Sequence, residues 1–334
     1  MRNLIKANHL IEEIARKYKE ITPITQKDEE LFSKFFKTEP HTYGNSWTYV
    51  TQGMYGIGPY GLGYKYYDGN NLSAIAVYPK IENPATHCFY WVRPIGRQIL
   101  DVILSLSSDI LKDYSMPTYT KKIYREQFYY LNKKGFKDTK KFPWHSSCPS
   151  EDDTYPEQII DAEKTLKIIE TLPKSKYVKK INLRAENLQK RYGIEINNSS
   201  FKSNAWTVAK RFFNSKTMKK KKINLSTEYD YYNMIFANKD RETLVKNVIY
   251  IKEKPVGFYL MEQLDYLYTS IYALIVLRDK IKFLADYTFL YILNNLKTPY
   301  LNTGGSEDEG IHQFKKKYYP QREQQMYWAT NYVS

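Results

Sequence analysis

The sequence predicts an α+β protein made of two similar halves, each a curved, mostly antiparallel sheet with flanking helices. A succession of strands, one long helix, a further strand and a short helix occurs twice along the chain. The 334 residues suffice for two ordinary domains. A segment rich in turn-forming residues, 142–156, separates the two patterns. We therefore place one domain at 1–150 and the other at 151–334.

The first half begins with helical spacing of its apolar residues and continues as an antiparallel sheet. Between 46 and 78, aromatic and β-branched residues surround glycines, and Asp68-Gly-Asn-Asn71 predicts a turn between two strands. The other expected elements are helices at 4–18 and 28–36, a strand at 88–92, a helix at 98–114, a strand at 118–123 and a helix at 125–134.

The second half repeats this order after a helical region. We expect helices at 175–192, 203–213 and 227–237, strands at 243–252, 256–263 and 266–277, a helix at 280–296, a strand at 299–302, a helix at 311–318 and a closing strand at 324–332. The strand–helix–strand succession predicts one βαβ crossover in each half.

The composition argues against several classes of protein. No run of about eighteen apolar residues exists, and the most hydrophobic stretch, Ser270–Leu277, is too short to span a bilayer. The first residues lack the pattern of a signal peptide, so we expect a cytoplasmic location. The two cysteines, Cys88 and Cys148, are too few for a disulfide scaffold or a zinc site, and no metal is expected.

Positive charge is concentrated in one segment of the chain. The net charge is +15, and residues 174–222 hold fifteen Lys or Arg against two Glu. Such a concentration is typical of a protein that binds a polyanion, either nucleic acid or an anionic membrane surface. The alternative is a solvated surface in a lysine-rich chain. The candidate nucleic-acid contacts are Lys176, Lys179, Lys180, Arg184, Lys190, Arg191, Lys210, Arg211, Lys219 and Lys220.

One carboxylate is a candidate general base. Glu262 lies toward the end of the predicted strand 256–263. A carboxylate within a sheet could accept the proton of an attacking amine. The alternative is an edge or solvent-facing glutamate.

The segment from Tyr300 to Pro320 combines a glycine pair with an acidic helix start. Ser306 and Glu309 have the spacing of a capping box, and Glu307 adds negative charge to the first turn. Capping does not explain Gly304-Gly305, which would let a backbone approach a ligand closely. Because the helix start is already acidic, we expect it to attract an amine and to repel a phosphate.

Two motifs resemble a known family. Lys176-Tyr-Val-Lys-Lys-Ile-Asn182 is similar to a K-Y-x-K-K-R-N stretch, and Asn302, Gly310, Lys315 and Pro320 match a second motif of that family. The family is that of the C-terminal domain of phosphatidylglycerol lysyltransferase. It has a tandem version of the GNAT acyltransferase fold and is related to the peptidoglycan-bridge aminoacyltransferases. The resemblance implies two GNAT-like acyltransferase domains, with 174–222 as a basic helical insertion in the second.

The resemblance also implies a reaction and roles for residues. An aminoacyl group would pass from aminoacyl-tRNA to an amine or hydroxyl of a small molecule, peptide or lipid headgroup by direct attack. Glu262 would be the base, and Lys315 a phosphate or carboxylate contact. The substrate amine would bind at Asn302, Gly304, Gly305, Ser306 and Glu307. The Q/R-x-x-G-x-G/A acetyl-CoA signature is missing after both candidate strands, so acetyl-CoA or another acyl-CoA is disfavoured and no cofactor is expected.

Two other functions stay open at this point. The chain could be a non-catalytic RNA-binding or partner-binding protein on the same fold, or a CoA-dependent N-acetyltransferase. The sequence leaves open the donor amino acid, the acceptor and the oligomeric state.

Overall fold

The computed structural model describes most of the chain as two compact units. The described residues are 2–52, 63–79, 87–139, 155–173, 176–215, 242–277, 281–306 and 308–332. Unit 1 takes the described residues up to Tyr155 and those from Gln325 onward, and unit 2 takes those from Pro156 to Gln324. The predicted helix at 227–237 lies outside the described residues.

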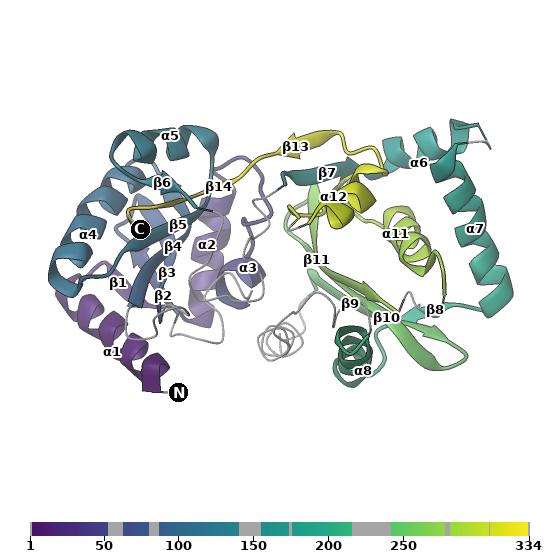
Figure 1. Cartoon of the computed structure of the whole chain (residues 1–334), viewed down its shortest axis with the longest axis horizontal. Helices are drawn as coiled ribbons and strands as arrows, with labels where there is room; N and C mark the ends of the chain where they lie inside the picture. The colour runs from purple at the N-terminus through teal and green to yellow at the C-terminus, as the bar shows by residue number, and fades with distance from the viewer. Residues whose placement is uncertain are drawn as a thin grey trace. The chain divides into compact units, whose positions relative to one another are not determined.

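Unit 1 is a seven-stranded sheet with helices (Figure 1). Its strand order is β1-β2-β3-β4-β5-β14-β6. Its elements are α1 (Arg2–Lys17), β1 (Ile21–Pro23), the 3₁₀ helix η1 (Gln26–Asp28), α2 (Glu29–Phe36), α3 (Trp47–Gln52), β2 (Tyr64–Tyr67), β3 (Asn71–Pro79), β4 (His87–Gly96), α4 (Ile99–Tyr114), β5 (Thr118–Ile123), α5 (Arg125–Lys133), β6 (Lys137–Asp138) and β14 (Tyr327–Thr330).

The sheet of unit 1 contains one parallel pair. β2, β3 and β4 run antiparallel, and α4 carries the chain to β5, which pairs parallel with β4. The next strand in space is β14, which pairs antiparallel with β5 and β6. The strand expected at 324–332 as the close of the second half is therefore corrected. Its residues divide between β13 (Arg322–Gln324) in unit 2 and β14 in unit 1, because pattern alone does not fix the sheet that a short strand joins.

The two faces of this sheet carry different side chains. One face, with Ile75, Phe89 and Trp91, forms a hydrophobic core with α1 and α4. The other face carries a second cluster of aromatic side chains from β3, β4, β5 and β14. Alternation along each strand separates the two sets.

Unit 2 repeats the arrangement. Its strand order is β13-β7-β12-β11-β10-β9-β8. Its elements are β7 (Glu157–Asp161), α6 (Ala162–Thr171), α7 (Tyr177–Tyr192), β8 (Glu195–Asn197), α8 (Phe201–Phe213), β9 (Leu244–Ile251), β10 (Lys254–Gln263), β11 (Tyr268–Val276), α11 (Leu284–Asn294), β12 (Tyr300–Asn302), α12 (Glu309–Lys316) and β13. β9, β10 and β11 are antiparallel, and β12 pairs parallel with β11 after α11.

Helices cover both faces of this sheet. Met261, Ile271 and Leu301 belong to a core that also contains residues of α6, α7 and α11. α8 packs on the opposite face, where the ring of Phe201 contacts that of Phe258 at a centroid distance of 6.2 Å. Phe258 and Met261 point to opposite sides because strand side chains alternate.

The predicted α+β class with one crossover per half is confirmed. The crossover helices and their flanking strands lie close to the predicted ranges. The sequence analysis missed β7 and α6, which follow directly on the turn-rich segment. No helix among the described residues is long and apolar enough to cross a membrane.

Gly96, at the end of β4, supplies a test of the fold. Its φ is +135°, and an added Cβ would lie 2.3 Å from Asn71 Oδ1 and 2.6 Å from the Asn70 carbonyl oxygen. Gly96→Ala should lower the free energy of unfolding by about 2–4 kcal/mol through backbone strain and overlap. Gly69 also has positive φ, +96°, but nothing within 4 Å. Gly69→Ala should therefore lower the free energy of unfolding by only about 1–2 kcal/mol. Urea denaturation measures both losses, and equal losses in the two variants would contradict this account.

Candidate active site

A row of polar side chains crosses the sheet of unit 2. Glu262 of β10 pairs with Ser270 of β11, Ser270 pairs with Asn302 of β12, and Asn302 pairs with Ile159 of β7. Directly paired residues place their side chains on the same face of a sheet. Neighbouring strands lie about 4.8 Å apart, so Glu262 and Asn302 are separated by roughly 10 Å with Ser270 between them. The structure thus brings the predicted base and the first residue of the predicted amine site onto one face.

This row faces away from the main core of unit 2. Met261, Ile271 and Leu301 precede or follow the polar residues on the same strands and pack under α6, α7 and α11. The polar residues therefore lie on the face that also carries α8. They are nonetheless buried: Glu262 is 4% exposed, and Ser270 and Asn302 are 0% exposed. The expectation of an edge or solvent-facing glutamate at position 262 does not hold.

A β-bulge orients Glu262. The pairing of β10 with β11 shifts between Leu260 and Met261, which leaves Tyr272 as the extra residue on β11. The Tyr272 hydroxyl donates a hydrogen bond of 2.9 Å to Glu262 Oε2. A carboxylate held by a phenol in this way has a defined orientation toward the row.

Two further residues of the row were missed by the sequence analysis. Glu157 of β7 is 0% exposed and accepts a hydrogen bond of 3.1 Å from Asn302 Nδ2. Ser270 Oγ is buried and has no hydrogen-bond partner among the described residues. Both belong to strands whose pairing the sequence does not show. The row therefore contains two carboxyl groups, one amide and one buried hydroxyl for which no described residue is a partner.

The glycine loop after β12 is held by a lysine. Gly304 has φ +67°, and its N–H donates to Asn302 Oδ1 at 2.8 Å. Lys315 of α12 donates to the carbonyl oxygens of Gly304, at 3.2 Å, and of Gly305. Its ammonium group thus fixes the loop, and the anion contact expected of Lys315 stays a prediction. Ser306 is 0% exposed with no partner for its hydroxyl among the described residues, and Glu307 lies outside them.

The start of α12 is capped by a residue other than the one expected. Asp308 is the N-cap, and its side chain accepts from the Ile311 N–H at 2.9 Å. The capping box predicted for Ser306 and Glu309 is thus wrong, and the cap lies two residues later than expected. Ser and Asp are both common cap residues, so the sequence alone did not distinguish Ser306 from Asp308.

His312 ties α12 to β7. It is 6% exposed, and its Nδ1 lies 3.0 Å from Gln158 Nε2. In the tautomer that fits this contact, Nδ1 accepts from the amide N–H and the proton of the neutral imidazole lies on Nε2. Burial lowers the pKa of His312 below its ordinary 6.5, and the charges of Lys315 and Lys316 act in the same direction.

This histidine predicts a pH dependence of stability. Because its pKa is lower in the folded chain than in the unfolded chain, the unfolded chain takes up a proton first as pH falls. The contribution of neutral His312 to the free energy of unfolding should be complete above about pH 7 and decline as pH falls through 6.5. Urea denaturation at pH 7.5 and 5.5 should show a smaller loss of stability in His312→Gln than in the parent chain. An equal loss in both would refute the assignment.

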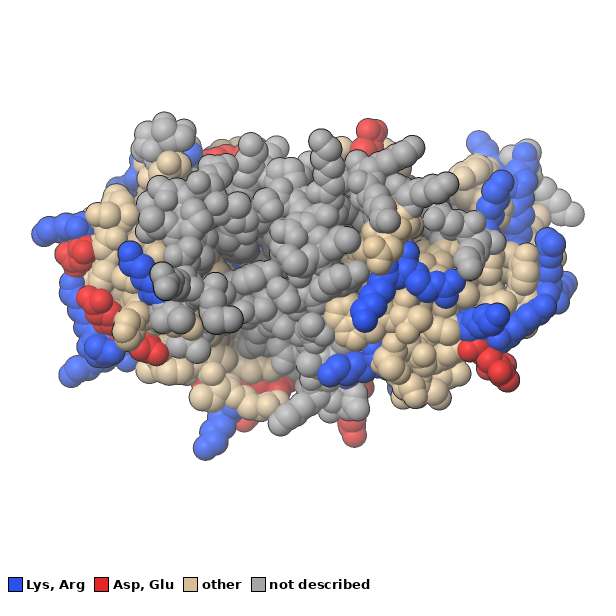
Figure 2. All heavy atoms as spheres, turned by 60° about the horizontal axis from the view of Figure 1, so that its bottom comes forward, with Lys and Arg blue, Asp and Glu red and all other residues tan. Residues whose placement is uncertain are grey.

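The predicted basic residues divide between two helices. Four exposed cations lie on one side of α7, opposite its buried residues Val178, Ile181 and Ala185. They are Lys176, the N-cap residue, and Lys180, Arg184 and Arg191 within the helix. Tyr177 is 65% exposed beside them. Figure 2 shows Lys and Arg side chains gathered on the surface of unit 2. We call Lys176, Lys180, Arg184 and Arg191 the basic face of α7.

The other cationic residues predicted to contact nucleic acid do not lie on the basic face of α7. Lys179 is partly buried and donates to the Glu170 carbonyl oxygen at 3.0 Å. Lys190 is exposed on α7 outside the basic face. Lys210 and Arg211 are exposed on α8, which covers the face of the sheet that carries the polar row, whereas α7 covers the other face. Lys219 and Lys220 lie outside the described residues.

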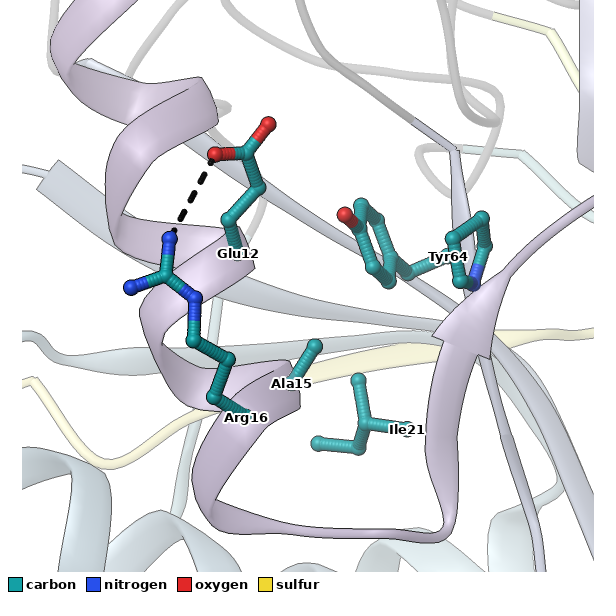
Figure 3. A pocket seen from close by; sticks show the side chains of 6 residues that line it. Glu12, Ala15, Arg16, Ile21 and Tyr64 are labelled. Atoms are coloured by element: carbon teal, nitrogen blue, oxygen red, sulfur yellow. Dashed lines mark ion pairs between the residues drawn. The ribbon is translucent and has the colours of Figure 1, made fainter.

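A groove in unit 1 offers no comparable chemistry. It has a volume of about 410 Å³ and lies between α1, β1 and β2 (Figure 3). The two charged residues that line it, Glu12 and Arg16, pair with each other at 4.0 Å. No group of three His, Cys, Asp or Glu side chains within the described part of the chain could hold a metal ion.

Comparisons with known proteins define the class of fold. No protein-family model matches the sequence, and no curated protein matches it. Among solved structures, a conserved protein of unknown function from Bacteroides thetaiotaomicron has a TM-score of 0.67 at 12% identity, covering 93% of this chain and 98% of that one. The C-terminal domain assigned to a lysylphosphatidylglycerol synthetase from Agrobacterium fabrum has a TM-score of 0.56 at 9% identity, with 92% of both chains covered.

A third similar structure consists of two GNAT domains in tandem. A tandem GNAT protein from the clavulanic acid biosynthesis pathway has a TM-score of 0.50 at 8% identity, covering 94% of this chain and 99% of that one. The chain thus has the tandem GNAT fold that was expected from its motifs.

Proposed function

We propose that this chain is an acyltransferase that transfers an aminoacyl group from aminoacyl-tRNA to an amine or hydroxyl acceptor. The observation that carries the proposal is the buried row formed by Glu262, Ser270, Asn302 and Glu157 in unit 2. Ser270 Oγ in this row is buried and has no hydrogen-bond partner among the described residues, which favours a ligand-binding role because a buried polar group without a partner is costly. Two carboxyl groups beside an amide suit the ammonium or amine of an aminoacyl group.

The row supports direct transfer without a covalent enzyme intermediate. The acceptor nitrogen or oxygen attacks the carbonyl carbon of the ester, and Glu262 takes the proton that the acceptor loses. The ester C–O bond then breaks, and the departing ribose hydroxyl receives that proton from Glu262. The Tyr272 hydroxyl orients Glu262, while Glu157 and Asn302 hold the amine of the donor. Placing both reactants on one rigid sheet face supplies the proximity that such a reaction needs.

The basic face of α7 supports tRNA as the donor carrier. Four exposed cations on one side of a helix, with an exposed tyrosine, suit a phosphate backbone and an unstacked base. The structures compared above include one assigned to lysylphosphatidylglycerol synthesis. That likeness agrees with aminoacyl transfer, while the chemistry of the row carries the argument.

One contact in unit 1 weighs against acyl-CoA as the donor there. A pyrophosphate bound at the start of α4 would need the first N–H groups of that helix. The Gln98 N–H, immediately before α4, already donates to Asn71 Oδ1 at 3.1 Å. Residues 278–280, which precede α11 by a few positions, lie outside the described residues.

Replacement of the base tests the chemistry. Glu262→Gln keeps an oxygen that can accept from Tyr272 but cannot take up a proton, so kcat should fall by about 10²- to 10⁴-fold. The measurement is transfer of a labelled aminoacyl group from charged tRNA, with ethanolamine as probe acceptor because it carries both an amine and a hydroxyl.

The matched control for this test is Glu195→Gln, at an exposed glutamate of the same unit. It should leave kcat unchanged. Full activity in the folded Glu262→Gln protein would contradict the mechanism and favour a binding protein on the same fold.

Replacement of the basic face tests the donor. Lys180, Arg184 and Arg191 changed together to Gln should weaken tRNA binding and reduce the slope of log affinity against log salt by about 2–3, because each lost phosphate contact removes just under one released counterion. Filter binding between 50 and 200 mM salt, a range over which such contacts act strongly, provides the measurement. Replacing the exposed Lys112, Lys133 and Lys134 of unit 1 by Gln changes the charge equally and should leave the slope unchanged. Equal effects of the two triple variants would refute a specific surface.

A further inference from the structure

Unit 1 contains three buried cationic side chains outside the site described above. Arg93, Lys121 and Lys122 are 0%, 1% and 0% exposed. Lys and Arg are almost never buried to this degree unless they are paired. The three lie at adjacent positions, because Val92 of β4 pairs with Lys121 of β5 and the next residues are Arg93 and Lys122.

The side chains converge on the loop before α3. Arg93 and Lys122 both have positive φ, +51° and +59°, which bends the two parallel strands at matching positions. A Cβ at Gly44 would lie 3.3 Å from Arg93 Cδ and 3.5 Å from Lys122 Cβ. The Nζ atoms of Lys121 and Lys122 lie 5.4 and 5.7 Å from the centroid of the Tyr49 ring. The three positive charges therefore gather in one part of unit 1.

Arg93 has only neutral partners within the described part of the chain. Its Nε donates to Asn45 Oδ1 at 2.6 Å, and its Nη2 donates to the Tyr124 hydroxyl at 2.9 Å. Both acceptors are fixed in turn: Asn45 Nδ2 and the Tyr124 hydroxyl each donate to the carbonyl oxygen of Pro40. Arg93 forms no ion pair with the described residues, and its Nη1 has no hydrogen-bond partner among them. The terminal edge of the guanidinium, where Nη1 and Nη2 lie side by side, thus keeps donors available.

We infer that this cluster binds the phosphoryl group of a ligand. The terminal edge of a guanidinium matches two oxygens of a tetrahedral anion, and its neutral supports hold it in one orientation. A phosphoryl group presents three acceptor oxygens to this cluster, where a carboxylate presents two. Aromatic rings flank the lysines, with Trp328 5.6 Å from Lys121 Nζ and Tyr43 5.6 Å from Lys122 Nζ. The part of the ligand beside the phosphoryl group therefore meets flat apolar surfaces. The site belongs to unit 1 and does not depend on the amine site of unit 2.

The test titrates the full chain with inorganic phosphate and with pyrophosphate in a buffer that contains neither. Sodium chloride of equal ionic strength provides the reference in thermal-shift and calorimetric titrations. Phosphate should raise Tm in a saturable manner, because a ligand that binds only the folded state stabilises it. Arg93→Met should weaken the binding at least about tenfold, since it removes charged hydrogen bonds. Arg125→Gln, at an exposed arginine of the same unit, is the matched control and should bind as the parent chain does.

Three results would overturn the inference. They are a phosphate response no larger than that of chloride, unchanged binding in Arg93→Met, and an equal saturable response to sodium acetate, which would assign the cluster to carboxylates. If circular dichroism shows that Arg93→Met does not fold, Lys122→Met replaces it, and its unchanged binding would overturn the inference equally. The Glu262→Gln variant should lose aminoacyl transfer but still bind phosphate, so each proposal can be refuted without the other.

Discussion

The parallel pairing of β11 with β12 is the constraint on which the candidate site depends. It places Ser270 opposite Asn302, and the antiparallel pairing of β10 places Glu262 opposite Ser270. A shift of one residue would turn Asn302 to the other face of the sheet. The register is held where the two strands begin: the rings of Tyr268 and Tyr300 stack at 5.2 Å, and the hydroxyls of Thr269 and Thr298 are hydrogen-bonded at 2.8 Å.

The turn between β10 and β11 fixes the register of the antiparallel pairing between these two strands. Asp265 Oδ1 accepts from the backbone N–H groups of Leu267 and Tyr268, each at 2.7 Å. Farther along the chain, Asp286 of α11 pairs with Lys317 and accepts from the buried Tyr318 hydroxyl at 2.9 Å, which fastens the end of α12 to the crossover helix. Lys315 then holds the glycine loop. The polar row and the loop are thus both supported by rigid elements, as precise placement of reacting groups requires.

The sequence predicted which strands exist but not how they pair. Glu262 could be named from its place toward the end of a predicted strand, and Asn302 from the family motif that it matches. Their shared face could not be predicted, since periodicity carries no information on register between strands far apart in sequence. Glu157 was missed for a related reason: β7 is short and follows a turn-rich segment, so its pattern resembles the linker. The sequence pattern around Arg93 does not indicate that its side chain is buried, and only the structure shows it.

The central claim is that the row in unit 2 recognises the amine of an aminoacyl group. The most direct measurement is calorimetric binding of 3′-aminoacylamino-3′-deoxyadenosine, an analogue of the tRNA end that cannot be transferred, compared with the same compound bearing a hydroxyl in place of the amine. The account predicts that loss of the amine weakens binding by about 10- to 100-fold, the usual effect of losing a hydrogen bond to a charged group. It also predicts that Glu157→Gln narrows this difference. Equal affinity of the parent chain for the two compounds would contradict it.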